Sequence, residues 1–409
     1  MRRFLRHINA VKLYVIFVTV ITFGGVVNAF PIIRFFYLSA IVLSLYYIIK
    51  NKLSFSSKLV FALFLISIIA LLSSFLTNSP ILYYQQLVLA SFIAFLAVSV
   101  FSYNYKEISD YIYIVCRIVC VLGAINFVLY TFVPDMYVEM TNDNSGYFVY
   151  SISYFFNYLP HKYHFITRNQ GLFWEPGVFA VVLNLHLFDV LIERSKNFKK
   201  AILPIFLIIT TFSTSGLVLM TCIVSYWFFF IRKMKFIYGI VIGSFFAAVF
   251  VPFLIDNTKE KVDQDSQSAA IRAYDLYMGV EIIKSYPMFG VGMNPDNYLK
   301  LTKTVDIGPF DINSFDTSRG CTNTFISVAS RLGIPLLLLF VLGIYNQKIY
   351  KKNSLFMLVM FLALSSEPLF DLPFIFLLLY SAIKLKRHES IRVLKKEHTI
   401  ESSNIIAIE

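Results

Sequence analysis

A glutamate stands among apolar residues in the segment RNQGLFWEPGVFA, which runs from Arg168 to Ala180. Ionisable side chains at membrane depth are costly and usually face a cavity, and the apolar GLFW before Glu175 predicts that its carboxylate lies below the surface. A carboxylate in that position could take the proton of a hydroxyl group. The alternative interpretation is a well-formed helix start, because Pro176 suits a first turn and a carboxylate suits the positive end of a helix dipole.

Four ionisable residues share one face of the helix expected here. At about 100° per residue they fall within a sector of about 60°. These residues are Arg168, Glu175, His186 and Asp189. His186 and Asp189 would lie ~16 and ~21 Å below Glu175, so we expect them to be structural. We therefore take Glu175 and Arg168 as the candidate site residues of this helix.

Arginines of other segments could converge with this pair. Arg272 lies in the amphipathic stretch AAIRAYDLYMGVEIIKS, and Arg319, Asn323 and Arg331 lead into a later apolar run. Guanidinium groups are suited to bidentate binding of a diphosphate. The alternative for Arg272 is a surface ion pair with Asp275, three residues further along the helix.

Other charges inside apolar runs have simpler explanations. Arg34 is close enough to an interface to extend its head group into water. Arg117 is either half of a packing ion pair or part of a substrate site. Glu367 and Asp371 flank Pro368 and are interpreted as the break between the last two helices.

The composition requires a bilayer around these residues. The chain of 409 residues is 58% hydrophobic and only 15% charged, unlike a soluble domain of this size. The basic residues, which give a formal net charge of +12, stand in short clusters between apolar runs. They predict membrane topology rather than nucleic-acid binding. The four cysteines suggest neither a disulfide framework nor a zinc site.

The apolar runs predict an all-α polytopic membrane protein, with about twelve transmembrane helices in one domain covering residues 1–409. We expect the first apolar run to remain as a helix rather than to be removed as a signal peptide. The run 200–231 is too long for one span and short for two, and the turn from Ser213 to Gly216 would divide it. The expected spans are 10–30, 31–49, 58–77, 81–102, 110–133, 171–193, 200–213, 215–231, 235–255, 321–346, 353–367 and 369–386.

Every second loop of this arrangement contains lysines and arginines, so the positive-inside rule puts both termini in the cytoplasm, including the tail 387–409. Two longer polar stretches, 134–170 and 256–320, then lie on the outer side. The aromatic residues of 134–170 predict packing on the membrane face. The stretch 256–320 is expected to begin hydrophilic, to continue as an amphipathic helix and to turn at YPMFGVGMNPDNY.

Three motifs occur in order along residues 168–335. An arginine is followed by G-x-F-x-E-P-G-x-F-A at a helix start, an outer loop contains R and then Y-P-x-F-G-V-G, and N-T-F-I-S-V-A-S-R-L-G-I-P opens the next helix. Together these motifs resemble the bacterial O-antigen polymerase and O-antigen ligase superfamily. Outside them the likeness extends only to hydropathy.

Two departures from the superfamily pattern bear on the choice between its activities. Ligases typically have a His-Asn pair before the late helix, and Thr322-Asn323 occupies that place here. This difference favours a polymerase. The Ser-Arg-Gly often found between the seventh and eighth helices is Ser-Thr-Ser-Gly here, at 213–216, so no arginine role is carried to that turn.

The resemblance implies a GT-C-like, metal-independent glycosyltransferase without a cofactor in the bacterial inner membrane. It would transfer a growing glycan from undecaprenyl diphosphate to the terminal sugar of another lipid-linked repeat unit, on the periplasmic side. Arg168 and Arg272, with Arg319, would hold the diphosphate and stabilise its developing charge. Glu175 would position or deprotonate the acceptor hydroxyl. Membrane lipid surrounds such an enzyme, and a chain-length regulator is a candidate partner.

Three alternatives remain open at this point. The chain could be an O-antigen ligase, or a polymerase of capsule or exopolysaccharide. A repeat-unit flippase, which also has about a dozen helices, is the alternative from another class, the transporters. Transporters are often built from repeated halves with sites at the bilayer midplane. Here the polar features lie in two unequal outer stretches, which favours chemistry at the outer leaflet.

Overall fold

The computed structural model describes residues 8–142, 147–159, 162–163, 166–194, 197–233, 266–302, 323–351 and 353–384. Six helical segments in this part of the chain are long and apolar enough to cross a membrane, and four further apolar helices are shorter. The described strands are short and all lie between residues 138 and 167. The expected all-α polytopic membrane fold is confirmed.

The helices follow the apolar runs closely. In chain order they are α2 (Ala10–Ile21), α3 (Ile32–Lys50), α4 (Ser57–Leu76), α5 (Gln85–Val100), α6 (Tyr105–Phe132), α7 (Pro176–Phe188), α8 (Ile202–Thr210), α9 (Thr214–Tyr226), α11 (Ser266–Ser285), α12 (Pro295–Thr302), α13 (Thr324–Leu332), α14 (Ile334–Tyr345), α15 (Asn353–Ser366) and α16 (Pro373–Ala382). π-Helical segments extend α7 through Asp189–Arg194 and α9 through Trp227–Ile231. Short 3-10 turns are Val26–Ala29, Ile81–Tyr84, Pro134–Met136 and Phe198–Lys200. Every expected span overlaps at least one of these helices except 235–255, which lies outside the described residues.

The turn expected at Ser213 divides the run 200–231 as predicted. Helix α8 ends at Thr210 and α9 begins at Thr214. The Ser213 hydroxyl accepts a hydrogen bond from the Gly216 N–H over 3.2 Å, which satisfies one of the free N–H groups at the start of α9. This run therefore forms two helices.

The lysine-rich loops meet at one end of the helices, which we call the basic end. The residues that define it are Lys58, Glu193, Lys351 and Lys384. The Lys58 ammonium donates to the Lys384 carbonyl over 2.7 Å, and the Lys351 N–H donates to the Glu193 carboxylate over 3.0 Å. Loops assigned to one side of the membrane by their charge are thus in contact.

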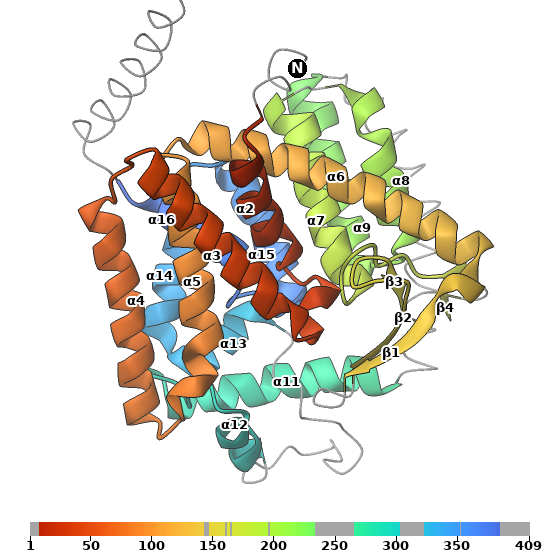
Figure 1. The fold of residues 1–409 in the computed structure, drawn as a ribbon. Helices are drawn as coiled ribbons and strands as arrows, with labels where there is room; N and C mark the ends of the chain where they lie inside the picture. Colours follow the sequence, from red (N-terminus) through yellow and green to blue (C-terminus); the bar gives the residue numbers. More distant parts are fainter. Residues whose placement is uncertain are drawn as a thin grey trace, which may run out of the picture.

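The opposite end, which we call the loop end, carries the strands, α11 and α12. The Asn297 side-chain amide of α12 donates to the Thr77 carbonyl over 3.0 Å, and the Asn169 N–H donates to the Thr210 carbonyl over 2.9 Å. Figure 1 shows α11 lying across this end, away from the N-terminus. Which end faces the cytoplasm stays a prediction.

Helix α7 occupies the centre of the assembly. All of its residues are buried, and it packs against α6, α8 and α9. Helix α4, in contrast, exposes large apolar side chains such as Phe61, Phe64 and Phe75, as expected for a helix that faces lipid. The first turn of α7, from Pro176 onward, is therefore buried at the loop end.

The described residues of the stretch 134–170 form two antiparallel sheets that pack on the helices. The first comprises β1 (Val138–Asn142), β2 (Tyr147–Ser151) and β3 (Asn157–Tyr158), and the second comprises β4 (Lys162–Tyr163) and β5 (Ile166–Thr167). Between β2 and β3, the Phe155 ring lies 5.7 Å from the Phe36 ring of α3, centroid to centroid. That this stretch lies on the membrane face stays a prediction.

The expected span 321–346 is wrong as a single helix. Gly333, with φ of 92°, separates α13 from α14. The side chain of Asn323, at one end of α13, donates to the Ser365 carbonyl over 3.1 Å. At the other end, the Ser330 carbonyl accepts from the Val291 N–H over 2.9 Å. Both ends contact loop-end segments, so α13 runs along this end instead of crossing the membrane.

The turn 286–292 was expected and is observed. Gly290 and Gly292 have φ of 62° and 84°, and a Cβ on Gly290 would lie 2.4 Å from the Ser330 carbonyl oxygen. The close approach of the two backbones explains why glycine is needed there. This contact fixes the amphipathic helix α11 and its turn against the end of α13.

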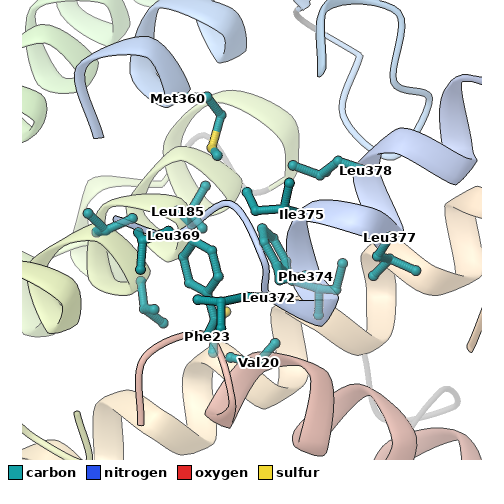
Figure 2. Close-up of a cluster of buried hydrophobic side chains, with 14 of the residues drawn as sticks. Val20, Phe23, Leu185, Met360, Leu369, Leu372, Phe374, Ile375, Leu377 and Leu378 are labelled. Atoms are coloured by element: carbon teal, nitrogen blue, oxygen red, sulfur yellow. The ribbon is translucent and has the colours of Figure 1, made fainter. Parts of the chain in front are cut away.

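A buried apolar cluster anchors the segment between α15 and α16. Figure 2 shows Leu369 and Leu372 directed into a cluster with Phe23, Leu185 and Phe374, which come from the chain after α2, from α7 and from α16. These side chains hold the intervening residues in place, because close van der Waals packing is what holds apolar helices together in a bilayer.

Candidate active site

Glu175 is the N-cap residue of α7 and lies at its rim. Its backbone is extended, with φ −138° and ψ 147°, and Pro176 takes the first helical position. The side chain is exposed and makes no hydrogen bond or ion pair with any other described residue. The expectation that it lies below the surface is wrong, because α7 begins only at Pro176 and leaves Glu175 outside the buried helix.

The helical face proposed for Arg168 does not form. Gly171 has φ of 57°, and the chain there pairs with the segment after α2: the Trp174 N–H donates to the Gly24 carbonyl over 3.0 Å and the Val26 N–H to the Leu172 carbonyl over 3.1 Å. Residues 168–175 are therefore not helical, and Arg168 does not share a face with α7.

The Arg168 side chain instead closes the end of α8. Its Nε donates to the Thr211 carbonyl over 3.2 Å and its terminal nitrogen to the Phe212 carbonyl over 3.3 Å. A cation suits this place, because carbonyls at a helix C-terminus lack partners within the helix. The half-buried guanidinium is thus fixed beside the turn between α8 and α9.

Buried amide side chains hold the segment between Arg168 and Glu175. The Asn126 amide donates to the carbonyls of Asn157 and Gly171 over 2.8 and 3.0 Å. The Asn169 amide donates to the Thr210 hydroxyl over 3.0 Å, and all three asparagines are fully buried. Because a buried network of this kind favours one conformation, the position of both site residues is well defined.

The carboxylate of Glu367 lies against the first turn of α7, a contact that the sequence did not reveal. A Cβ on Gly177 would lie 2.1 Å from Glu367 Oε1, and Glu367 is only 4% exposed. A carboxylate is stabilised at this positive end of α7. Glu367 does more than mark a helix break. Two features of the sequence could have indicated this contact. They are an acidic side chain within an apolar run, at Glu367, and a glycine directly after Pro176.

Asn323 joins the start of α13 to the segment that carries Glu367. Its side-chain oxygen accepts from the N–H groups of Phe325 and Ile326 over 2.9 and 3.1 Å. The Thr324 hydroxyl accepts from the Leu369 N–H over 2.8 Å and donates to the Glu367 carbonyl. The two motifs are thereby brought together at the loop end.

Arg331 and Asp371 form the other charged part of the site. Arg331, expected one to three turns inside the span 321–346, lies half-buried in the last turn of α13. Burial raises the pKa of the Asp371 carboxyl, and the Arg331 charge acts in the opposite direction. Asp371 also lies near the Tyr37 hydroxyl, which accepts from the Gln86 side-chain amide over 2.9 Å.

The structure places the other predicted site residues differently. Arg272 lies in the second turn of α11, and Arg319 lies outside the described residues. Arg117 is exposed on α6 and close enough to His186 to interact electrostatically. The His186 ring lies 5.2 Å from the ring of Tyr113, on the half of α6 nearer the basic end. Arg117 is therefore not brought to the loop end.

His186 and Asp189 lie within this group near the basic end. Asp189 is 1% exposed and pairs with Arg194 over 3.1 Å, and Arg194 also binds Asp110. Asp189 is thus part of an ion-pair network far from the loop end, and the expected structural role of His186 stays a prediction. Among the described residues, no group of three or more His, Cys, Asp and Glu side chains is arranged to hold a metal ion.

Residues 201–341 match the family model described as O-antigen ligase (Wzy_C). The match supports the O-antigen polymerase and ligase superfamily. It covers α8 to most of α14, with Arg272, Asn323 and Arg331, and supports a role in the assembly of O-antigen or another polysaccharide. It does not distinguish a polymerase from a ligase. No curated protein and no solved structure matches the chain.

The contact between Glu367 and Gly177 gives a first testable prediction. Gly177→Ala is expected to lower the free energy of unfolding by about 1–2 kcal/mol, because the added methyl group meets a buried carboxylate and overpacking costs ~1–3 kcal/mol. Helix propensity alone predicts the opposite sign, a gain of up to ~1 kcal/mol. The measurement is the thermal unfolding midpoint of the purified protein in detergent.

A second substitution serves as the control for this prediction. Glu367→Asp shortens the side chain by one methylene group, so Gly177→Ala combined with Glu367→Asp should recover part of the lost stability. A higher unfolding midpoint for Gly177→Ala alone would contradict the close contact.

Proposed function

We propose that this protein is an O-antigen polymerase that joins undecaprenyl-diphosphate-linked repeat units at the periplasmic face of the bacterial inner membrane. One observation carries the proposal: the start of α7 and the motif residues of α13 are brought together at the loop end. The residues of α13 lie within the region that matches the O-antigen ligase family model. Helix α7 lies just before that region. Members of that family are glycosyltransferase-like enzymes that act on lipid-linked sugars.

In the proposed reaction, the acceptor hydroxyl oxygen bonds to the anomeric carbon of the donor glycan. The bond from that carbon to the diphosphate oxygen breaks, its electron pair leaves with the diphosphate, and the hydroxyl proton passes to a carboxylate. The protein then has two tasks: to accept a proton and to stabilise the charge of the leaving group. We propose that no metal ion takes part.

Glu175 is the carboxylate proposed to meet the acceptor. It is exposed at the start of the central helix, and within the described part of the chain no side chain neutralises it. Glu367, held over Gly177, borders the same helix start from its buried side. The buried carboxylate therefore stabilises the first turn of α7, and the exposed one is left to accept the proton of the hydroxyl.

Arginines are proposed to hold the diphosphate. Arg272 lies seven residues before Gly279, and so on the same side of an ideal helix. Gly279 faces α13, since a Cβ there would lie 2.0 Å from Ile326. The backbone position of Arg272 is therefore on the side of α11 that faces the other helices. Arg168 and Arg319, with Arg331, complete the proposed set.

The absence of a His-Asn pair in the sequence favours polymerisation over ligation. Thr322 cannot act as the base that the histidine is proposed to provide in ligases, and Asn323 is already engaged as the cap of α13. The ligase, and polymerases of capsule or exopolysaccharide, remain the alternatives within the same chemistry.

The surface glycan ladder of a deletion strain tests the proposal. A polymerase deletion leaves lipid A–core capped by a single repeat unit, so the ladder should shorten to one step and regain its full length when the gene is restored. Loss of a ligase would remove even the single-unit cap. Loss of a flippase would leave repeat units on the cytoplasmic leaflet. Either of these two outcomes would replace the proposed function.

A further inference from the structure

An apolar groove lies between α4, α14 and α16. One end of it, at Leu332 and Phe370, adjoins Arg331 and Asp371 of the candidate active site. The volume of the groove is about 650 Å³, within the range of small-molecule sites. Leu65, Leu339 and Leu342 line it and are 42%, 57% and 56% exposed. The groove therefore opens on the side of the assembly that faces lipid.

The groove extends from α13 to the basic end. Leu332 of α13 lines it on one side and Lys348 and Lys384 on the other. A neighbouring hollow of about 540 Å³ is lined by Lys58 and shares Ala62 with the groove. Three lysines thus stand where this apolar surface meets the membrane boundary.

Two of these lysines are held by the end of α16. The Lys58 ammonium donates to the Lys384 carbonyl over 2.7 Å, and the Lys348 ammonium donates to the Ile383 carbonyl over 3.0 Å. The Lys348 ammonium also lies 5.7 Å from the centre of the Tyr105 ring. Since successive carbonyls orient them, the two ammonium groups are close together before any ligand arrives.

The three charges are not compensated within the described residues. None of Lys58, Lys348 and Lys384 forms an ion pair with a carboxylate there. Burial lowers the pKa of Lys348, and the charges of Lys384 and Lys58 lower it further. The three ammonium groups therefore repel one another, and an anion placed between them would reduce this repulsion.

We propose that the groove binds one anionic phospholipid, with its phosphate against Lys58, Lys348 and Lys384 and an acyl chain along the wall of α4 and α14. Basic pockets between transmembrane helices suit the head groups of anionic lipids. The surroundings supply both parts of the ligand, because the groove faces the bilayer and the lysines lie at its end. This inference does not depend on the proposed polymerase activity.

Native mass spectrometry of the delipidated full-length protein tests this proposal. The probes are phosphatidylglycerol and phosphatidylcholine with identical acyl chains. One phosphatidylglycerol molecule should bind at least tenfold more tightly than phosphatidylcholine, roughly the effect of one to two lysines at an anionic surface. The triple variant Lys58→Gln, Lys348→Gln, Lys384→Gln should lose this preference.

Two controls keep the outcome interpretable. The variant Lys50→Gln, Lys199→Gln, Lys200→Gln removes the same charge from exposed lysines outside the groove and should keep the preference. Ala62→Trp fills the groove without changing charge and should weaken phosphatidylglycerol binding as well. Unfolding midpoints identify any variant that fails to fold.

Several results would overturn the proposal. They are equal binding of the two phospholipids, an equal loss of preference in both lysine variants, and undiminished binding to Ala62→Trp.

Discussion

Glu175→Gln is expected to abolish long-chain surface polysaccharide while leaving the protein folded and at its normal level. Removal of a proton acceptor lowers the rate by ~10²–10⁴-fold, which leaves the ladder at a single step. The structural cost is small, because the Glu175 side chain is exposed and makes no hydrogen bond or ion pair within the described residues. Loss of a favourable charge at a helix start costs only ~0.3–1 kcal/mol.

A matched control separates a catalytic role from a general effect of charge. Asp296 is also an exposed carboxylate in the first turn of a helix at the loop end. Asp296→Asn should therefore leave the ladder unchanged. Both proteins are compared by membrane protein level and by the size distribution of the glycan.

Persistence of long chains in Glu175→Gln cells would reject Glu175 as the proton acceptor. Arg272→Ala should also remove long chains, because an arginine that stabilises the leaving diphosphate is needed for bond cleavage. If Arg272→Ala abolished long chains and Glu175→Gln did not, the proposed diphosphate site would be retained. Asp371 would then be the next candidate for the proton acceptor.

The positions of most helices could be predicted from sequence, because a long apolar run is a local signal that does not depend on tertiary contacts. The turn at Ser213 was also predictable, since Ser-Thr-Ser-Gly both interrupts an apolar run and caps a helix. The same reasoning missed the break at Gly333. There the apolar run continues across the glycine, and only contact with the 286–292 turn requires its φ of 92°.

The arrangement of the candidate site could be predicted only in part. Glu175 and Arg168 were selected by the cost of placing charge in an apolar run, and both do lie at the loop end. Their separation by a non-helical segment depends on pairing with the chain near Gly24, which is a tertiary contact. The contact between Glu367 and Gly177 is likewise set by residues far apart in sequence, so helix periodicity carried no signal for it.

Substitutions at Arg331 and Asp371 are expected to have a large effect on stability. Arg331→Gln should lower the free energy of unfolding by ~1–3 kcal/mol, because it removes a positive charge from beside a half-buried carboxyl. Asp371→Asn should cost less, since the half-buried guanidinium retains access to water. The double variant should be more stable than Arg331→Gln alone.

The pH dependence gives this pair a further signature. Burial already raises the pKa of Asp371 above its usual value, 3.8, and Arg331 partly offsets the increase. Without Arg331 the folded-state pKa rises further. A group with a raised folded-state pKa stabilises the fold below its unfolded pKa and loses that contribution as the pH increases. The unfolding midpoint of Arg331→Gln should therefore fall relative to wild type as the pH rises from ~4 to ~7.

Activity decides whether this pair is structural or belongs to the reaction. If Arg331 only balances Asp371, the double variant should regain polymerisation together with stability. If Arg331 holds the diphosphate, as proposed, the double variant should stay inactive despite its recovered unfolding midpoint, because one of the cations that oppose the charge of the leaving group is then missing. A glycan ladder of normal length in the double variant would remove Arg331 from the site. An inactive but stable double variant places the transferred bond near the end of α13.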